Sequence, residues 1–326
     1  MTLELAVSTH SLSKRFGDLV AVKAIDLEVA MGSVTALLGP NGAGKTTVVR
    51  MLATLTKPTS GTASVCGYDV EREADAVRSV ISLTGQFAAL EDNLTARENL
   101  LLMARLRGYG KSAGDRVVES LIERFDIGEF ANTLIKRVSG GQRRRTDLAA
   151  SLVVQPRLLV LDEPTTGLDP RGRQAVWETV RDLVHQGVTL LLTTQYLEEA
   201  DALADKIILI DHGQSVATGT SSELKSRIGD QRVDIVAASA DDLEKLEVAF
   251  DGRFDAVVSR ERRTVSIPAP SGIDVLTAVT NAVRESGVIA DEVALRRPTL
   301  DDAFFALTGQ GPTGESHRDL DLEGAR

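Results

Sequence analysis

Short apolar runs alternate with longer amphipathic segments between Ser33 and Gly213. Such runs are typical of strands covered on both faces of a parallel sheet, and the amphipathic segments are typical of connecting helices. We expect strands at residues 34–38, 158–161, 188–192 and 207–210, and helices at residues 45–55 and 172–184. The pattern therefore predicts an α/β fold with a buried parallel sheet.

Two further regions depart from this pattern. Residues 90–152 show helical patterning without a strong strand, so we expect a helical subdomain at about residues 87–152. Around residues 213–229 the sequence turns polar and rich in Gly, Ser and Thr, and a new alternation begins at Val233. We therefore predict one domain at residues 1–228, a second at 229–309, and a disordered tail at 310–326.

The second domain reads as a small α+β module. Its expected order is strand 232–238, helix 241–250, a strand pair within 256–267, helix 273–286, strand 292–296 and helix 300–307. Nine basic and fifteen acidic residues in 229–309 disfavour nucleic-acid binding by this module. Its aromatic residues, Phe250, Phe254, Phe304 and Phe305, are expected in a core, although a small-molecule regulatory site is an alternative.

Composition narrows the class of protein. The 326 residues carry 37 Lys and Arg against 47 Asp and Glu, a net charge of −10, which argues against general attraction to nucleic acid or anionic membranes. No apolar run approaches the ~20 residues that span a bilayer. The N-terminus lacks the pattern of a secretory signal. A single cysteine, Cys66, and four dispersed histidines predict neither a disulfide nor a Cys- or His-ligated metal, and a reducing cytoplasm is the expected location.

A glycine-rich motif follows the first predicted strand and opens a helix. The residues Gly39-Pro40-Asn41-Gly42-Ala43-Gly44-Lys45-Thr46 fit G-x-x-x-x-G-K-[ST], and Thr47 follows them. In such a loop, glycines let the backbone N–H groups surround a phosphate at the positive end of a helix, the lysine adds a charge, and the hydroxyl can hold Mg²⁺. The alternative is a glycine-rich turn that merely ends a strand.

Two adjacent carboxylates, Asp162 and Glu163, follow the strand at 158–161. Because side chains alternate along a strand, we expect them to leave on opposite faces and to have different roles. Asp162 suits the Mg²⁺ shell, and Glu163 suits a base that polarises the water attacking a γ-phosphate. The alternative is an acidic pair that caps the next turn.

A second phosphate-binding pattern lies at Ser139-Gly140-Gly141-Gln142, before a helix. The alternative is an ordinary serine N-cap. One nucleotide does not need two such sites. The basic run Arg143, Arg144 and Arg145 that follows is interpreted first as a solvated helix face.

The order of these motifs resembles the nucleotide-binding subunit of ABC transporters over about residues 3–228. The matching elements are the phosphate loop, Gln86, Ser139-Gly140-Gly141-Gln142, and Asp162-Glu163-Pro164-Thr165-Thr166-Gly167-Leu168-Asp169. Three further segments resemble the daunorubicin/doxorubicin-resistance subfamily of exporters: residues 143–152, Thr193-Thr194-Gln195-Tyr196-Leu197-Glu198-Glu199-Ala200-Asp201, and Arg296-Arg297-Pro298-Thr299-Leu300-Asp301-Asp302-Ala303-Phe304. The resemblance implies a P-loop NTPase fold of the ABC type, with a core sheet and a helical subdomain.

The resemblance also implies residue roles. Phe16 would stack on adenine, although a buried core phenylalanine is the alternative. Gln86 would reach Mg²⁺ and the attacking water, although a polar turn residue is the alternative. Ser139 and Gly141 would bind the γ-phosphate of an ATP held by a second protomer, so that two chains enclose two ATP molecules. Asp169 would lie across that interface.

One position departs from the family. Gln195 stands where the family has a switch histidine, just after a strand at residues 188–194. An amide can donate a hydrogen bond to the γ-phosphate but cannot titrate near neutral pH. We therefore expect an active but slow ATPase.

The leading interpretation is an ATP- and Mg²⁺-dependent ATPase subunit that drives export of a hydrophobic drug or similar metabolite. It would act as a homodimer on the inner face of the cell membrane, attached to a separate integral membrane permease. The second domain would stabilise the dimer or dock on the permease. The alternative is a soluble ABC-type ATPase acting on ribosomes or nucleic acid, which the acidic balance and the single phosphate loop disfavour.

Overall fold

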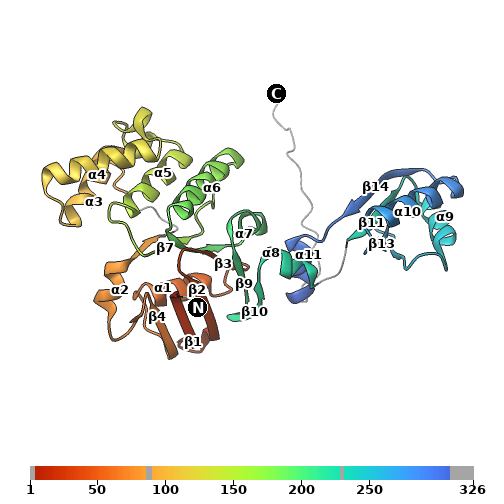
Figure 1. Ribbon diagram of the computed structural model, residues 1–326, viewed down its shortest axis with the longest axis horizontal. Coiled ribbons are helices and arrows are strands. Elements are labelled where there is room, and N and C mark those ends of the chain that lie inside the picture. Colours follow the sequence, from red (N-terminus) through yellow and green to blue (C-terminus); the bar gives the residue numbers. More distant parts are fainter. Residues whose placement is uncertain (1–3, 86–89, 228–230, 309–326) are drawn as a thin grey trace, which may run out of the picture. The chain divides into compact units, whose positions relative to one another are not determined.

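The computed structural model describes residues 4–85, 90–227 and 231–308 (Figure 1). The chain divides into two compact units, Met1–Ser221 and Ser222–Arg326, and each is described by itself. No helix within the described ranges is long and apolar enough to cross a membrane.

A six-stranded sheet forms the centre of the first unit, with strand order β10-β9-β3-β8-β7-β6. Five neighbouring strands are parallel, and β10 pairs antiparallel with β9 at one edge. All four predicted strands are confirmed, and β6 and β10 are additional ones. The strands are β3 (Val34–Leu38), β6 (Ile81–Thr84), β7 (Leu158–Asp162), β8 (Thr189–Thr194), β9 (Lys206–Asp211) and β10 (Gln214–Gly219).

Helices connect these strands, as the amphipathic segments predicted. Helix α6 buries Val176, Val180 and Leu183 along one face. Helix α1 ends three residues earlier than expected, because Thr54 takes a positive φ of 61° that ends the helical path. These helices are α1 (Lys45–Leu52), α2 (Ala74–Val80), α6 (Pro170–His185) and α7 (Leu197–Leu203). Helix α8 (Ser221–Ser226) follows β10 at the point where the chain divides into its two units.

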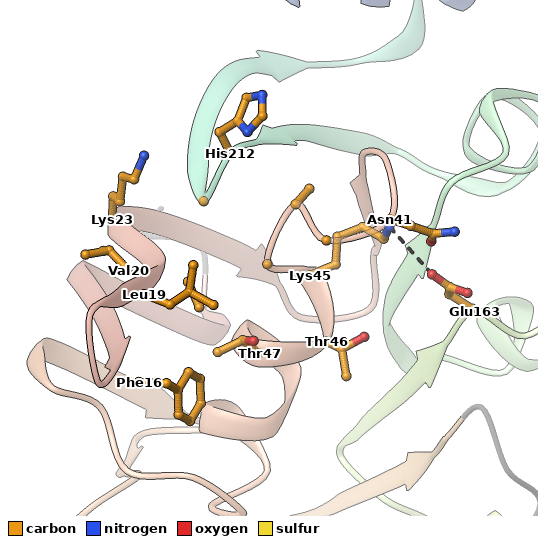
Figure 2. Close-up of a pocket in the computed structure, with 15 residues that line it drawn as sticks. Phe16, Leu19, Val20, Lys23, Asn41, Lys45, Thr46, Thr47, Glu163 and His212 are labelled. Atoms are coloured by element: carbon orange, nitrogen blue, oxygen red, sulfur yellow. Dashed lines mark ion pairs between the residues drawn. The ribbon is translucent and has the colours of Figure 1, made fainter.

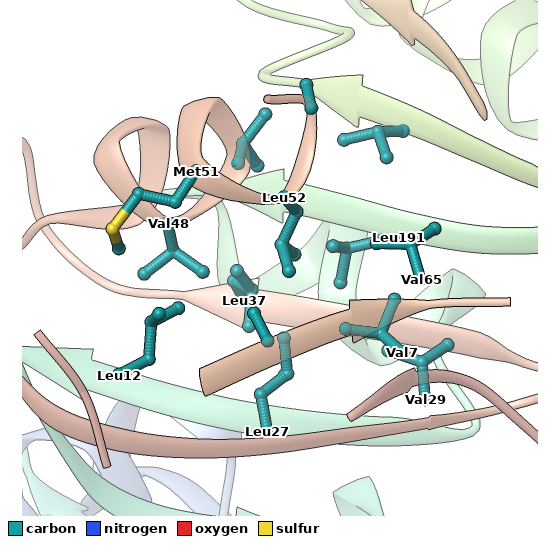
Figure 3. Packing of buried hydrophobic residues seen from close by; sticks show 14 of the residues in the cluster. Val7, Leu12, Leu27, Val29, Leu37, Val48, Met51, Leu52, Val65 and Leu191 are labelled. Atoms are coloured by element: carbon teal, nitrogen blue, oxygen red, sulfur yellow. The ribbon is translucent and has the colours of Figure 1, made fainter. Parts of the chain in front are cut away.

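An antiparallel sheet that the sequence pattern did not reveal packs beside the first, in the order β2-β1-β4-β5. Its strands are β1 (Leu5–Phe16), β2 (Leu19–Ala30), β4 (Ser60–Val65) and β5 (Tyr68–Asp69). Leu12 and Leu27 from this sheet share one buried cluster with Leu37 of β3 and with Val48 and Leu52 of α1 (Figure 3). Helix α1 is therefore held by apolar contacts with both sheets. The loop that joins β3 to α1 is thus fixed at both of its ends.

The segment between β6 and β7 is helical within its described residues, as predicted. It contains α3 (Ala96–Leu106), α4 (Lys111–Arg124), the 3₁₀ turns η1 (Gly128–Phe130) and η2 (Ile135–Arg137), and α5 (Gly140–Ser151). Helix α3 begins in a capping box in which Thr95 and Glu98 satisfy each other's backbone N–H groups. The expected start of the helical segment, residues 87–89, lies outside the described residues.

The second unit has the predicted α+β order. Its elements are β11 (Arg232–Ala237), α9 (Ala240–Phe250), β12 (Val257–Ser259), β13 (Thr264–Pro268), α10 (Ile273–Ser286), β14 (Ala290–Arg296) and α11 (Leu300–Thr308). The sheet is antiparallel in the order β12-β13-β11-β14. Val233 and Ile235 pack with Leu246 and Phe250 of α9 in its core. Phe250 and Phe254 meet edge to face at 5.3 Å, which confirms their expected core role.

Candidate nucleotide-binding site

The phosphate loop (residues 39–46) leaves the carboxyl end of β3 and runs into α1. Gly44 has a φ of 103°, and a Cβ on it would lie 2.6 Å from the carbonyl oxygen of Ala21. A Cβ on Gly39 would lie 2.0 Å from the carbonyl oxygen of Ile210. Glycine is therefore required at both positions, because the loop packs directly on the backbone of neighbouring strands.

Lys45 is held inside this loop. Its Nζ donates to the carbonyl oxygens of Gly39 at 2.7 Å and Pro40 at 3.0 Å, and lies 3.6 Å from Oε1 of Glu163. Burial lowers the pKa of the Lys45 ammonium, and the Glu163 carboxylate opposes that shift. The loop thus carries a positive charge whose hydrogen-bond partners are backbone carbonyls, which an incoming phosphate can replace.

The acidic pair lies beside consecutive residues of α1. Asp162, which is 6% exposed, accepts hydrogen bonds from the hydroxyls of Thr46 at 3.2 Å and of Thr193. Strand alternation does not extend to Glu163, because β7 ends at Asp162 and Glu163 takes a φ of 50°. The turn directs Glu163 toward Lys45, and its backbone N–H donates to the carbonyl of Thr193. Asp162 therefore contacts Thr46 and Glu163 contacts Lys45, so the two carboxylates do have different partners in one site. The cause is the turn at Glu163 and not the alternation of side chains along the strand.

A cavity of about 560 Å³ opens over the phosphate loop (Figure 2). Phe16 lines it and is 50% exposed, so the alternative of a buried core phenylalanine is wrong. The ammonium of Lys14 lies 4.9 Å from the ring centroid. Lys23 and His212 also line the cavity, and sequence reasoning missed both because neither belongs to a motif. The lining residues are Phe16, Leu19, Val20, Ala21, Lys23, Asn41, Gly42, Ala43, Gly44, Lys45, Thr46, Thr47, Glu163, His212 and Gly213.

A second cavity, of about 480 Å³, surrounds the Ser-Gly-Gly turn (residues 139–142). Ser139 caps α5 as a capping box, with its Oγ accepting from the N–H of Gln142 at 3.2 Å. Asp169 lines the same cavity and caps α6, with its Oδ1 accepting from the N–H of Gly172 at 2.8 Å. The serine is thus an N-cap, as the alternative held, but it also borders a cavity. The two cavities share none of their described lining residues.

Two predicted glutamines have different outcomes. Gln86 lies outside the described residues, and the preceding Gly85 accepts a hydrogen bond from Arg144. Gln195 follows β8, is half-buried, and does not line the first cavity. The N–H of Gly39 donates to the carbonyl of Thr194 at 3.2 Å, so the backbone of the next residue, Gln195, lies close to the phosphate loop.

Arg144 corrects the expectation of a solvated basic face. It is 8% exposed, pairs with Asp147 at 3.1 Å, and bonds the carbonyl of Gly85. Burial lowers the pKa of its guanidinium, and Asp147 opposes the shift. Arg143 and Arg145 remain nearer the surface and pair with acids of the helical segment. Only one of these three arginines therefore faces the interior. The sequence alone does not show which of three consecutive arginines is the buried one.

Comparison with known proteins agrees with this geometry. The sequence profile of the ABC transporter family matches residues 22–166. The daunorubicin resistance ATP-binding protein DrrA3 of Streptomyces coeruleorubidus is 49% identical over 306 residues, which cover 94% of this chain and 96% of that protein. The doxorubicin resistance ATP-binding protein DrrA of Mycobacterium tuberculosis (strain H37Rv) is 44% identical over 311 residues, 94% of each. The Nod factor export ATP-binding protein I of Rhizobium etli is 35% identical over 306 residues, 94% of each.

Solved structures share the fold of most of this chain. A structure described as the ATP-binding subunit of an ABC transporter aligns with a TM-score of 0.61 at 25% identity, over 69% of this chain and 93% of that one. The cbiO1 protein of Clostridium perfringens aligns with a TM-score of 0.64 at 22% identity, over 75% and 95% respectively. The chain therefore belongs to the ABC transporter family and is an ATP-binding subunit with that family's ATPase fold.

Proposed function

We propose that this chain hydrolyses ATP to drive export of a hydrophobic drug, antibiotic or related metabolite through a separate integral membrane permease. Its similarity to relatives named for daunorubicin and doxorubicin resistance and for Nod factor export supports this cargo class. The chain would sit on the cytoplasmic side of the membrane, attached through the permease.

One observation carries the proposal that the working unit is a homodimer. The chain has two phosphate-binding turns, and the cavities around them share no described residue. Each is half of a site. In the dimer, the phosphate loop of one protomer would face the Ser-Gly-Gly turn of the other, and Asp169 would lie near the same interface. Two equivalent ATP sites result from the two-fold symmetry.

The first cavity would bind ATP by contacts with both its triphosphate and its adenine. The N–H groups of residues 41–46 and the N-terminus of α1 favour the triphosphate, and Lys45 adds a compact positive charge. Phe16, already exposed at the other side of the cavity, would stack on adenine. Binding therefore depends on local charge and does not require a positive net charge.

The residues present fit a Mg²⁺ ion at the base of the loop. The Thr46 hydroxyl and the Asp162 carboxylate lie 3.2 Å apart, and such hard oxygen ligands are those that Mg²⁺ prefers. When bound, Mg²⁺ neutralises charge on the β- and γ-phosphate oxygens. We further propose that Gln86 contributes to this site.

Glu163 would orient and polarise the attacking water, because its side chain is 8% exposed and borders the cavity. Gln195 would donate an amide hydrogen bond to the γ-phosphate and would not take up a proton near neutral pH. Ser139 of the partner would complete the set of donors. Catalysis would rest mainly on positioning and charge neutralisation.

The experiment uses purified full-length protein. Glu163→Gln keeps the shape of the side chain but removes its basicity, so we expect ATPase activity to disappear while ATP binding persists and an ATP-bound dimer accumulates in light scattering. Lys45→Ala serves as the control that loses binding. Hydrolysis at the wild-type rate by Glu163→Gln, or a monomer at saturating ATP, would refute the assigned roles.

Coupling to a membrane protein is tested separately. Co-expression with a candidate permease, a neighbouring reading frame that encodes several apolar spans of ~20 residues, should bring the chain into the membrane fraction, and the pair should co-purify. Expression without that permease is the control. Co-sedimentation with ribosomes and no membrane recovery would favour the soluble alternative.

A further inference from the structure

We propose that Glu199 is a positioning residue that joins the N-terminal halves of α5, α6 and α7, so that the two half-sites of one chain are aligned together. Each of these helices begins beside a residue to which a role toward ATP is given above. Ser139 caps α5, Asp169 caps α6, and Gln195 immediately precedes the cap of α7. The inference rests on the proposed function, because the roles of these three residues are proposed there.

Glu199 is an acidic residue with no exposure to solvent. Its side chain is fully buried and is not among the described residues that line either cavity. A buried carboxyl group is costly unless polar neighbours hold it. Burial raises the pKa of the Glu199 carboxyl, and the groups that oppose this rise come from four other segments: the hydroxyls of Thr194 and Thr165, the indole of Trp177 and the guanidinium of Arg144. The carboxyl group therefore lies at the meeting point of several elements.

Two contacts join α6 to α7. The indole Nε1–H of Trp177 donates to Oε1 of Glu199 at 3.2 Å. One turn earlier on α6, the guanidinium of Arg173 lies 5.7 Å from the ring centroid of Tyr196, the N-cap of α7. Because residues four apart share one face of a helix, Arg173 and Trp177 present the same face of α6 to α7. The start of α7, and with it the backbone of Gln195, is thus fixed relative to α6.

A buried charge joins α5 to the same cluster, and α6 contacts both α5 and α7 (Figure 1). Arg144 of α5 donates through Nη1 to Asp147 at 3.1 Å, but its buried Nε and Nη2 have no hydrogen-bond partner in the described part of the chain. Burial lowers the pKa of the Arg144 guanidinium, and the Glu199 carboxylate opposes that shift after Asp147. Little water screens opposite charges in such an interior, so Glu199 attracts α5 as well as holding α6.

The cluster connects the two half-sites of one chain. Gln195 would contact the ATP bound by its own phosphate loop, whereas Ser139 and Asp169 would face the ATP bound by the partner. A shift of one helix is passed to the others, because close-packed interiors transmit strain. Glu199 would touch neither ATP nor the attacking water. Its removal should therefore lower kcat and leave the affinity for ATP unchanged, since misplacement of groups that act on the transition state slows the chemical step.

Kinetics test the positioning role in the full-length protein. Glu199→Met keeps a side chain of similar length but removes both oxygens, so we expect kcat to fall on the order of tenfold, with the Kd for ATP changed by less than about twofold. Glu199→Gln keeps an acceptor for Trp177 and should retain most of kcat. Glu198→Met, on the adjacent exposed residue, is the matched control and should leave kcat unchanged.

A double variant identifies the link. Trp177→Phe keeps an aromatic ring but removes the donor to Glu199, so the variant with both Trp177→Phe and Glu199→Met should be no slower than Glu199→Met alone. Additive losses of kcat, or an unchanged kcat in Glu199→Met, would overturn the proposal. So would a loss of kcat accompanied by equal losses of ATP affinity and of the urea midpoint, because that pattern is purely structural.

Fluorescence tests the link without hydrolysis. Trp177 is the only tryptophan of the chain, so its emission reports the surroundings of Glu199. In Glu163→Gln, ATP with Mg²⁺ should change this emission; adding Glu199→Met should abolish the change, and adding Glu198→Met should not. If ATP leaves the emission unchanged while Glu163→Gln still forms an ATP-dependent dimer, the coupling is wrong and the proposed function stands. A change that depends on Glu199 without an ATP-dependent dimer would give the reverse result.

Discussion

Replacing Phe16 by alanine separates adenine stacking from phosphate binding. Stacking of a base on an aromatic side chain contributes roughly 1 to 3 kcal/mol, so the Kd for ATP should rise by about 5- to 150-fold. The affinity for inorganic triphosphate should not change, because the phosphate loop is untouched. Phe16→Trp should retain ATP affinity, since it keeps an aromatic face.

The same substitution should cost little stability. The ring is 50% exposed, so alanine forfeits about half of the roughly 1.5 to 3 kcal/mol that a fully buried phenylalanine contributes. Loss of the contact with Lys14 adds about 0.5 to 1 kcal/mol at such an exposed position. Urea unfolding measures this term, which is small against a typical stability of ~5 to 15 kcal/mol.

Titration calorimetry with ATP and with triphosphate is the assay. Leu19→Ala is the matched control, because Leu19 lines the same cavity, is 68% exposed and cannot stack as an aromatic. It should weaken ATP binding less than Phe16→Ala does. An equal loss of ATP and triphosphate affinity in Phe16→Ala would show that the ring supports the loop and does not bind adenine.

Three other predictions concern the site and its surroundings. Glu163→Gln should abolish ATP turnover, whereas Gln195→Ala should mainly lower kcat in a phosphate-release assay; equal and complete losses would contradict the separate roles. Arg144→Ala removes the buried cation that pairs with the Asp147 carboxylate and should destabilise the fold by about 3 to 5 kcal/mol in urea unfolding, whereas Arg143→Ala, from an exposed pair, should cost no more than about 1 kcal/mol. Burial raises the pKa of the Glu199 carboxyl, so its neutral form stabilises the fold below the pKa of the unfolded chain, and that contribution is lost as pH rises through the raised folded pKa. Glu199→Gln should therefore raise the urea midpoint more at about pH 8 than at about pH 4.5, and an equal change at both would refute this reasoning.

The sequence by itself determined the parts of the fold that depend on local pattern. The parallel strands appear as short apolar runs because both faces of the sheet are covered, and the phosphate loop appears because its glycines, lysine and threonine must follow in one order. The order of elements in the second unit was equally readable. Each strand, helix and loop among these features is encoded in a short run of consecutive residues.

The antiparallel sheet was not readable in this way. Along β1, buried Val7 and Leu12 are separated by irregular pairing with β2, and Ser11 takes a φ of 48°. Thr9 looks like a polar surface residue, yet it is buried and bonds the carbonyl of Ile25 on β2. Because a polar side chain such as Thr9 is buried and the pairing of β1 is irregular, apolar and polar residues do not alternate simply along this strand.

Tertiary structure alone decided which of several similar residues serve the site. Phe16 is exposed at the cavity, and Glu163 turns toward Lys45. Of the three consecutive arginines 143–145, only Arg144 is buried. Exposure and proximity depend on contacts between residues far apart in the chain, and local sequence carries no direct record of them.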